Sequence, residues 1–363
     1  MLKAAIVGYG YMGEIRKKAI EKNSDLELSM ICETSQNASL KNLGCPIVSD
    51  TQKVFDSDCD IIFVCTPNNL IPDLTIKGLL AGKHVFSEKP PGRNKPDIEA
   101  IIAAERSSPA SKLMFGFNHR YHPAILNAKK IVDSQKLGKL LWIRGLYGKS
   151  GGLNFKTSWR NKQAISGGGI LLDQGIHMID LFNYFCPESE FTDVKSTIDN
   201  NHWGLEVEDN AFVIMANKKG QQASLHSSAT FWKHQFRIEL GLTNGYLSIE
   251  GFLSKSGSYG REQLRIGKRQ FEDLSAAVGN PSEEIIYFDR DESWDIEVKK
   301  FVDAIQKNKP VTESSSTDAL RAMEIVEKAY GNSQFYRHNE GQHGILNRSI
   351  KSFPTRHQTD GMP

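Results

Sequence analysis

The chain has 363 residues, 24% of them charged, and a formal net charge of +2. This length allows two domains, each with its own core. The balanced charge gives no broad basic surface of the kind that a nucleic-acid-binding protein needs. No apolar run approaches the roughly 18 residues of a membrane span, and the sequence shows no signal-peptide core. We therefore expect a cytoplasmic protein without a nucleic-acid or membrane partner.

The five cysteines are scattered along the chain, and none stands in a C-x-x-C spacing. Their odd number argues against a disulfide framework, and their spacing argues against a zinc site. We predict that the chain has no metal site and stays in a reducing compartment.

The first elements predicted in chain order are a strand, a glycine turn and a helix. Residues 2–7 form a short apolar run, the turn reads Gly8-Tyr9-Gly10-Tyr11-Met12-Gly13, and an amphipathic segment extends to about residue 22. In this G-x-G-x-x-G spacing, the first glycine makes the turn, the second lets backbone approach a pyrophosphate, and the third lets helix pack on strand. The hexapeptide alone is a weak signal, which its place between strand and helix strengthens. We predict dinucleotide binding by Gly8, Gly10, Tyr11, Met12 and Gly13.

A second strand, residues 26–32, ends at Glu33, where this kind of fold places an acidic residue to bind ribose hydroxyls. The next cation along the chain is Lys41, so a 2′-phosphate would meet a carboxylate with no nearby positive charge. This favours NAD as the cofactor, and NADP remains an alternative. A plain exposed glutamate at a strand end is the other interpretation of Glu33.

Two more apolar runs, residues 60–65 and 84–87, read as buried parallel strands, and residues 113–117 read as the last strand of this unit. Strands alternate with helices, which is typical of a doubly wound α/β domain, here residues 1–120. Ligands of such sheets bind beyond the carboxyl ends of the strands. We therefore expect one crevice to be bordered by Gly10, Thr66, Pro67, Asn69, Glu88, Lys89 and Asn118.

Residues 121–337 follow another pattern. A helix (124–136), a long strand (140–149) and a glycine-rich basic loop (151–169) precede several strand-like runs between 191 and 287. Short polar turns between these runs predict a large, open, mostly antiparallel sheet of an α+β domain, with helices 294–305 and 317–336 closing it. The polar tail, residues 338–363, has no periodicity, and we expect it to be loosely held.

Three glycines, Gly167 to Gly169, lead into an apolar segment with Asp173, His177 and Asp180. In a helix these three side chains share one face, because they are four and three residues apart. Such a face is a candidate proton-transfer site, and on these residues alone an ordinary surface Asp–His pair is an equal alternative. We expect the glycines to let the start of the helix approach substrate or nicotinamide.

Gly8-x-Gly10-x-x-Gly13, Glu88-Lys89-Pro90 and the glycines followed by Asp173-x-Gly175-x-His177 together resemble the Gfo/Idh/MocA family of dinucleotide-dependent oxidoreductases. The resemblance covers roughly residues 2 to 336 and is more specific than any single motif. It implies an NAD(P)-binding domain joined to an α+β domain, and a homo-oligomer, dimer or tetramer, formed through the open sheet. It also implies that Lys89 lies beside substrate and nicotinamide, and that Asp173 and His177 are similar to the family's proton-transfer pair.

The chemistry of these residues agrees with that role. Oxidation of an alcohol needs a base for the hydroxyl proton and a group that stabilises the alkoxide. His177 suits the base because its pKa is near neutrality, and we predict that Asp173 orients its ring. Lys89 supplies positive charge, and its bond to Pro90 can be cis. Pairing of Lys89 with Glu88 at the surface is the alternative interpretation.

The loop before the glycines contains Trp159 and Arg160, on which a sugar could stack and an anionic group could bind. An ordinary exposed loop has the same composition, so both interpretations stay open. The predicted substrate-binding residues are Lys89, Arg120, Tyr147, Trp159, Arg160, Asp173 and His177.

These features predict an NAD(P)-dependent oxidoreductase that transfers a hydride between nicotinamide and a hydroxyl or keto carbon of a sugar, inositol, amino sugar or nucleotide-linked sugar. A NAD-dependent glycoside hydrolase of the same fold is the first alternative. A non-catalytic dinucleotide-sensing regulator is the second, and the intact set of Lys89, Asp173 and His177 argues against it, because a sensor needs no proton-transfer group.

Overall fold

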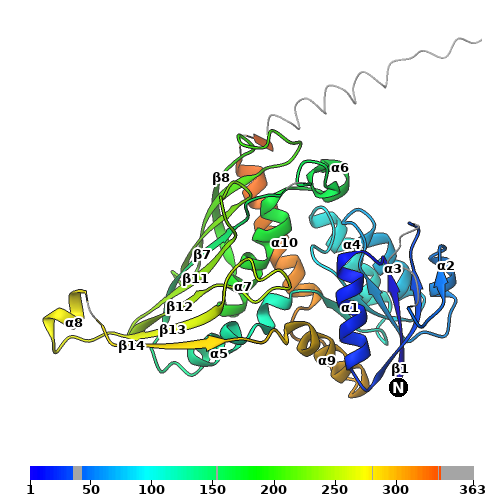
Figure 1. The fold of residues 1–363 in the computed structure, drawn as a ribbon, viewed down its shortest axis with the longest axis horizontal. Helices are drawn as coiled ribbons and strands as arrows, with labels where there is room; N and C mark the ends of the chain where they lie inside the picture. Colours follow the sequence, from blue (N-terminus) through cyan, green and yellow to red (C-terminus); the bar gives the residue numbers. More distant parts are fainter. Residues whose placement is uncertain (36–42, 153, 280, 334, 337–363) are drawn as a thin grey trace, which may run out of the picture.

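The computed structural model describes residues 1–35, 43–152, 154–279, 281–333 and 335–336, so the predicted tail lies outside the described residues. In these ranges the chain forms two sheets, which Figure 1 shows on opposite sides of a layer of helices. No helix in the described ranges is long and apolar enough to cross a bilayer.

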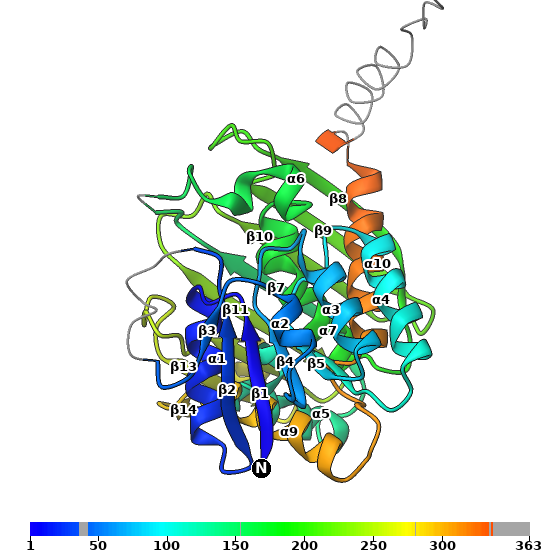
Figure 2. The same ribbon diagram turned by 90° about the vertical axis from the view of Figure 1, so that its right-hand side faces the viewer.

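The first sheet has six parallel strands in the order β3-β2-β1-β4-β5-β6, and helices connect β1 to β2, β3 to β4, β4 to β5 and β5 to β6, which confirms the doubly wound Rossmann fold. Strands β1, β2, β4, β5 and β6 lie within a few residues of the predicted ranges, whereas the short elements β3 and α2, between residues 47 and 55, were not predicted. Figure 2 shows β1, β2 and β4 side by side. The elements are β1 (Leu2–Val7), α1 (Tyr11–Lys22), β2 (Leu26–Cys32), β3 (Ile47–Val48), α2 (Gln52–Phe55), β4 (Ile61–Val64), α3 (Ile71–Leu80), β5 (His84–Ser87), α4 (Lys95–Ser107) and β6 (Leu113–Phe115).

The second sheet has eight strands in the order β14-β13-β12-β11-β7-β10-β9-β8. Among the described strands of this sheet, only β7 and β10 pair in parallel, so the predicted large, mostly antiparallel sheet is confirmed. The elements are α5 (Pro123–Asp133), β7 (Leu140–Gly148), α6 (Gln163–Ser166), α7 (Ile176–Phe185), β8 (Phe191–Asp199), β9 (Asn210–Asn217), β10 (Gln222–Ser228), β11 (Gln235–Leu242), β12 (Gly245–Glu250), β13 (Glu262–Lys268), α8 (Leu274–Val278) and β14 (Glu283–Phe288).

One face of this sheet is covered and the other is open. Helix α7 lies between the sheet and α10 (Ser316–Asn332), and nine of its ten residues are buried, because side chains on all sides of this helix meet protein. On β9, Val213 and Met215 face the helices, whereas the alternate residues Phe212 and Ile214 are 48% and 63% exposed on the open face.

Helix α9 (Ser293–Gln306) does not close the second domain as predicted. Its buried residues Val298, Phe301 and Val302 join the core of the first sheet, where they meet Ile6 and Phe86. The amphipathic pattern was sufficient to predict a helix, but it does not specify which sheet the apolar face covers. The chain therefore returns to its first domain before it forms α10.

Candidate active site

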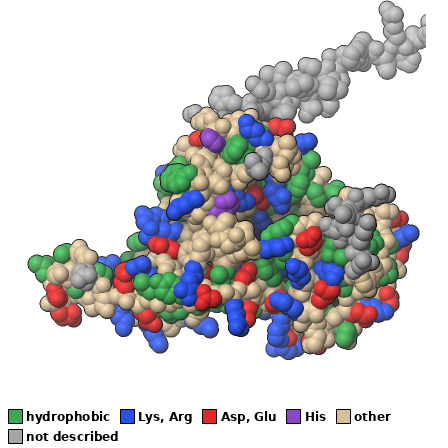
Figure 3. All heavy atoms as spheres, viewed as in Figure 1, with side chains coloured by type: hydrophobic (Ala, Val, Ile, Leu, Met, Phe, Trp, Pro, Cys, Tyr) green, Lys and Arg blue, Asp and Glu red, His purple; other side chains and the backbone are tan. Residues whose placement is uncertain are grey.

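A cleft of about 1290 Å³ is lined by residues of both domains. Figure 3 shows a hollow between the two halves of the molecule, with Lys and Arg side chains around it. Most of the predicted site residues line the cleft: Gly8, Gly10, Tyr11, Met12, Glu33, Thr66, Pro67, Glu88, Lys89, Asn118, Tyr147, Trp159, Arg160, Asp173 and His177. Gly13, Asn69 and Arg120 do not line it.

The glycine turn has the geometry that a bound diphosphate requires. Gly8 has a φ of +91°, and a Cβ there would lie 2.7 Å from the carbonyl oxygen of Cys65. A Cβ on Gly10 would meet nothing within 4 Å, so its backbone faces open space in the cleft. Gly13 instead lets α1 pack on β1, since its Cβ would lie 2.4 Å from the carbonyl oxygen of Gly8. The prediction that Gly13 contacts the dinucleotide is therefore corrected to a packing role.

Glu33 lies at the end of β2 with a fixed carboxylate. It accepts hydrogen bonds from the backbone N–H of Tyr9 at 2.7 Å and from the N–H and hydroxyl of Ser35 at 2.8 Å. Burial raises the pKa of Glu33, but these hydrogen bonds outweigh it and lower the pKa overall. The hydroxyl of Thr66 is buried without a partner in the described structure and lines the same cleft. Together these groups fit a dinucleotide.

Asn69 was predicted to border the crevice, and the structure assigns that place to its neighbour. The side-chain amide of Asn68 is buried and donates to the carbonyl oxygen of Ser166 at 2.8 Å, which ties the first domain to the loop of the second. Sequence spacing could not decide between two adjacent asparagines in a turn.

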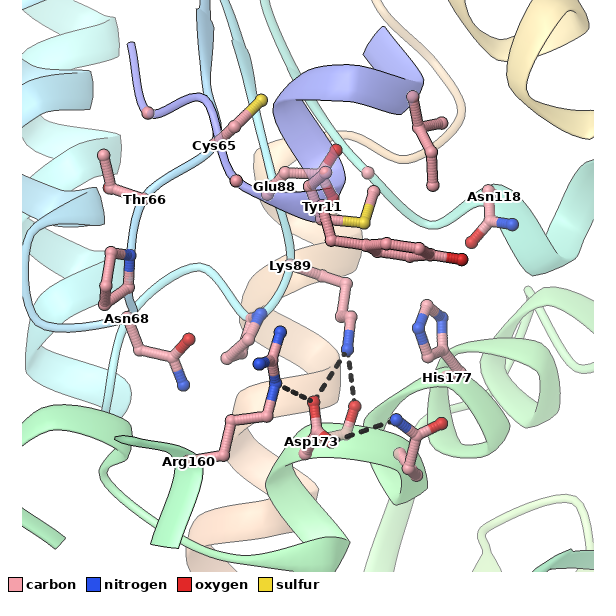
Figure 4. Close-up of a pocket in the computed structure, with 18 of the residues that line it drawn as sticks. Tyr11, Cys65, Thr66, Asn68, Glu88, Lys89, Asn118, Arg160, Asp173 and His177 are labelled. Atoms are coloured by element: carbon pink, nitrogen blue, oxygen red, sulfur yellow. Dashed lines mark hydrogen bonds and ion pairs between the residues drawn. The ribbon is translucent and has the colours of Figure 1, made fainter. Parts of the chain in front are cut away.

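Lys89 is held against the second domain. Its ammonium group donates to the backbone oxygen of Asp173 at 2.6 Å and to the carboxylate at 3.3 Å (Figure 4). The Lys89–Pro90 bond is cis, as the sequence allowed. The alternative pairing of Lys89 with Glu88 is wrong, because the buried Glu88 carboxylate binds Arg16 at 2.6 Å.

Asp173 is surrounded by cations. Besides Lys89, the ammonium of Lys149 lies 3.3 Å and the Nε of Arg160 lies 3.5 Å from its carboxylate, and the amide of Gln174 donates to it at 3.0 Å. Burial raises the pKa of Asp173, but Lys149, Lys89 and Arg160 outweigh it and hold the pKa well below its usual range. Asp173 is therefore a carboxylate that organises three positive charges.

His177 does not pair with Asp173 as predicted, since neither of its ring nitrogens has a hydrogen bond to a described residue. Residues Leu171–Gly175 form a π-helical turn before α7, so the i, i+4 relation of an α-helix does not hold here. The imidazole instead stacks on His119, with ring centroids 3.6 Å apart. Burial, assisted by Lys89, keeps the pKa of His177 well below its usual value, so the ring is neutral.

Arg120 is the clearest error among the predicted site residues. Its guanidinium is buried and donates to the carboxylate of Asp180 at 2.6 and 2.7 Å, with Asp318 at 3.3 Å. A buried guanidinium needs such partners, because an unpaired charge in a core is costly. Asp180 therefore faces Arg120 and supports the fold, which agrees with its place outside the family motif.

The three glycines pack closely against protein. Gly169 also lines the cleft, so the expectation that the glycines let the start of the helix approach substrate or nicotinamide stays a prediction. Added Cβ atoms would lie 2.4 Å from Arg93 at Gly167, 2.1 Å from Tyr330 at Gly168, and 2.0 Å from the carbonyl oxygen of Glu208 at Gly169. The Glu208 carboxylate accepts the N–H of Gly169 at 2.7 Å and fixes the start of the following turn.

Sequence reasoning missed His119, Lys149 and Glu208. His119 bonds Tyr147 at 3.1 Å and Asn118 at 3.1 Å, and so holds the ring on which His177 stacks. The segment from Asn118 to His122, which includes His119, carried a weak signal, because five polar or aromatic residues follow a buried strand. Lys149 and Glu208 gave no sequence signal, since each is one charged residue at the end or start of a strand.

Among the described residues, no group of three or more His, Cys, Asp or Glu could hold a metal ion.

The parallel sheet, the glycine turn and the Lys–Asp–His group define a dinucleotide-dependent oxidoreductase. Residues 2–117 match the family model described as "Oxidoreductase family, NAD-binding Rossmann fold", and residues 125–248 match "GFO/IDH/MocA C-terminal domain". The chain belongs to the Gfo/Idh/MocA family of oxidoreductases.

Relatives of the chain include two dehydrogenases. Levoglucosan dehydrogenase of Pseudarthrobacter phenanthrenivorans is 29% identical over 210 residues, which are 52% of each chain, so the match spans about half of that relative. Inositol 2-dehydrogenase of Rhizobium meliloti is 24% identical over 342 residues, which are 90% of this chain and 96% of that one.

Solved structures share the fold along nearly the whole chain. Levoglucosan dehydrogenase in complex with NADH has a TM-score of 0.78 at 22% identity, covering 92% of this chain and 98% of that one. Aldose-aldose oxidoreductase from Caulobacter crescentus, complexed with glycerol, has a TM-score of 0.77 at 23% identity, covering 93% and 98%.

Proposed function

We propose that this chain is a NAD(P)-dependent dehydrogenase that transfers a hydride between nicotinamide and a hydroxyl or keto carbon of a sugar, inositol, amino sugar or nucleotide-linked sugar. The observation that carries the proposal is the meeting of Lys89, from the first domain, with Asp173 and His177, from the second, in the cleft that contains the glycine turn. The named activities of the relatives support a carbohydrate-like substrate.

A bound nicotinamide supplies the hydride acceptor or donor, and the residues of the chain manage the proton and the charge on oxygen. Because His177 is neutral, its imidazole accepts the hydroxyl proton in oxidation and returns it in reduction. Lys89 places positive charge beside the reacting oxygen, and Asp173 holds its ammonium group in place.

The proposed cofactor is NAD in preference to NADP. The carboxylate of Glu33 is fixed at the end of β2 and carries a negative charge, since its pKa is lowered. A carboxylate accepts hydrogen bonds from ribose hydroxyls and repels a 2′-phosphate.

We also propose that the chain forms a homo-oligomer, a dimer or tetramer, through the open face of the eight-stranded sheet. Large apolar side chains are exposed on this face, among them Trp142, Phe212 and Ile214. Apolar surface of this kind is typical of contacts between proteins.

The test is a screen of sugars, inositols, amino sugars and nucleotide sugars with NAD, followed by the absorbance of reduced nicotinamide. We expect one class to be oxidised, and Lys89→Ala or His177→Ala to lower kcat by at least roughly 100-fold with unchanged dinucleotide affinity in calorimetry. Near-normal rates in both variants would contradict the assigned roles. Cleavage of a glycoside without net NADH would identify the hydrolase alternative instead.

A further inference from the structure

The substrate end of the cleft has more positive charge than its acidic residue balances. Lys89, Lys149 and Arg160 each form an ion pair with Asp173, and none of the three forms an ion pair with another carboxylate in the described structure. Three cations thus face one carboxylate, and two positive charges are left without a counter-charge.

The remaining carboxylates that line the cleft are engaged elsewhere. Each has its own partner: Glu88 binds the buried Arg16, Glu33 binds backbone at the end of β2, Asp73 binds Lys77, Asp291 accepts the N–H of Ser293, and Asp295 binds Lys22. These carboxylates lie in the first domain or in and near α9, and each already has a partner. They therefore do not neutralise the cations around Asp173.

Two of the cations, Lys149 and Arg160, also have N–H donors that can bind a further acceptor. The contacts of Lys149 and Arg160 with Asp173, at 3.3 and 3.5 Å, are long, and their side chains are 25% and 45% exposed. Arg160 uses its Nε for this contact, which leaves the outer nitrogens of the guanidinium for a second acceptor. The guanidinium lies 4.5 Å from the ring of Trp159, which limits the directions in which it can point.

Lys149 and Arg160 approach from different parts of the second domain. Lys149 directly follows β7, and Arg160 lies in the short helix Trp159–Asn161. Both line the same cleft as His177, and Figure 4 shows Arg160 and Lys89 on the same side of Asp173. Paired ammonium and guanidinium groups suit a carboxylate or a phosphate, because each supplies charged N–H donors to an oxygen anion.

We propose that the substrate carries an anionic group, a carboxylate or a phosphate, which Lys149 and Arg160 bind while the reacting hydroxyl lies beside Lys89 and His177. This inference rests on the proposed dehydrogenase function and narrows its substrate to acidic or phosphorylated carbohydrates. Lys149 and Arg160 then determine specificity, and Lys89 retains its contact with the reacting oxygen.

The test is calorimetry on the NADH-saturated protein with matched ligands: D-glucose, D-glucuronate, D-gluconate and D-glucose 6-phosphate. We expect at least one anion to bind about tenfold or more tightly than D-glucose, with the gain falling as salt is raised. Tighter binding of D-glucuronate or D-gluconate would indicate a site for a carboxylate. Tighter binding of D-glucose 6-phosphate would indicate a site for a phosphate. A panel in which no anion binds more tightly than D-glucose overturns the inference.

Lys149→Met and Arg160→Met should each remove most of that preference and leave NADH affinity unchanged. Lys162→Met is the matched control, because Lys162 is exposed on the same loop and does not line the cleft. If the variants weaken NADH instead, the cations serve the cofactor and the inference is wrong. Anion preference without any turnover would count against the dehydrogenase function and not against this site. Turnover of neutral sugars alone would support the dehydrogenase function and contradict the anion site.

Discussion

At the scale of single residues, burial shifts the pKa of two groups in the cleft, Lys89 and His177, toward their neutral forms. Burial lowers the pKa of Lys89, and Asp173 opposes that effect. Burial also lowers the pKa of His177, so it is neutral and can act as a base where an ordinary histidine would be partly protonated. The proposed oxidation combines this neutral imidazole with an ammonium group on Lys89, whose charge Asp173 favours.

The pH dependence of sugar oxidation follows from these two directions. The rate should fall on the acid side only as pH drops through the lowered pKa of His177, below the usual 6.5. It should fall on the alkaline side as pH rises through the lowered pKa of Lys89, before the usual 10.5. A profile of kcat/KM against pH measures both limits. An acid limb centred at or above 6.5 would contradict a buried His177 as the base.

Glu33 decides the cofactor in this proposal. Glu33→Ala removes the acceptor of ribose hydroxyls and the partner of the Tyr9 and Ser35 N–H groups. We expect NADH to bind roughly tenfold more weakly and the preference over NADPH to shrink, because one or two charge-assisted hydrogen bonds are lost. Titration calorimetry with both dinucleotides measures the change. Tighter NADPH than NADH binding by the unaltered chain would remove the assignment.

At the scale of elements, a buried charge cluster joins three parts of the first domain. Arg16 of α1 lies 2.6 Å from Glu88, which follows β5, and 2.7 Å from Glu297 of α9. Since Lys89 comes next in the chain, this cluster fixes the position of the backbone that carries the ammonium group. Arg16→Met would leave two buried carboxylates unpaired, which costs about 3–5 kcal/mol of unfolding free energy.

Glu297 should make stability depend on pH. Burial raises its pKa from 4.5 to about 8, with Arg16 opposing that rise. Because the folded state favours the protonated acid, the stability from Glu297 is complete below about pH 4.5 and is lost as pH rises to about 8. Glu297→Gln lacks this loss, so its melting temperature should rise relative to the unaltered chain between pH 5.5 and 8. If the melting temperatures of the variant and of the unaltered chain change equally with pH across this range, the raised pKa of Glu297 is contradicted.

At the scale of the whole molecule, the proposed homo-oligomer rests on the exposed apolar side chains of the large sheet's open face. Phe212 and Ile214 stand side by side on β9 and are exposed, although apolar side chains of this size are usually buried. The helices α7 and α10 cover the other face, so the proposed interface lies on the face that they leave open.

Phe212→Asp combined with Ile214→Asp should convert the oligomer to a monomer, because four carboxylates would be buried across a symmetric dimer interface. Light scattering coupled to size-exclusion chromatography measures the mass. Leu80→Asp is the control, since Leu80 is 62% exposed on α3 of the first domain. A monomeric unaltered chain, or a double variant that keeps its mass, would contradict the proposed assembly.

The sequence by itself determined the order and type of most elements, the doubly wound fold and the residues of the dinucleotide turn. These follow from local rules: apolar runs, amphipathic periods and the spacing of Gly8, Gly10 and Gly13 each involve residues close in the chain. The family motifs also predicted that Lys89, Asp173 and His177 belong to one site, although Lys89 is distant in the chain from the other two. The edge strands β3 and β14 were not predicted: β3 has only two residues, and the last strand-like run expected in the second sheet ended near residue 266, because Glu283 and Glu284 hide the pattern of β14.

Only the tertiary structure decided what each side chain faces. Asp173 pairs with Lys89 across 84 positions of the chain and does not pair with His177, four positions away, because a π-helical turn separates them. Arg120 is buried against Asp180, and α9 returns to the first sheet, each through contacts between distant segments. Local patterns fix backbone conformation, but charge pairing and burial depend on which segments meet, and that is a property of the whole packed chain.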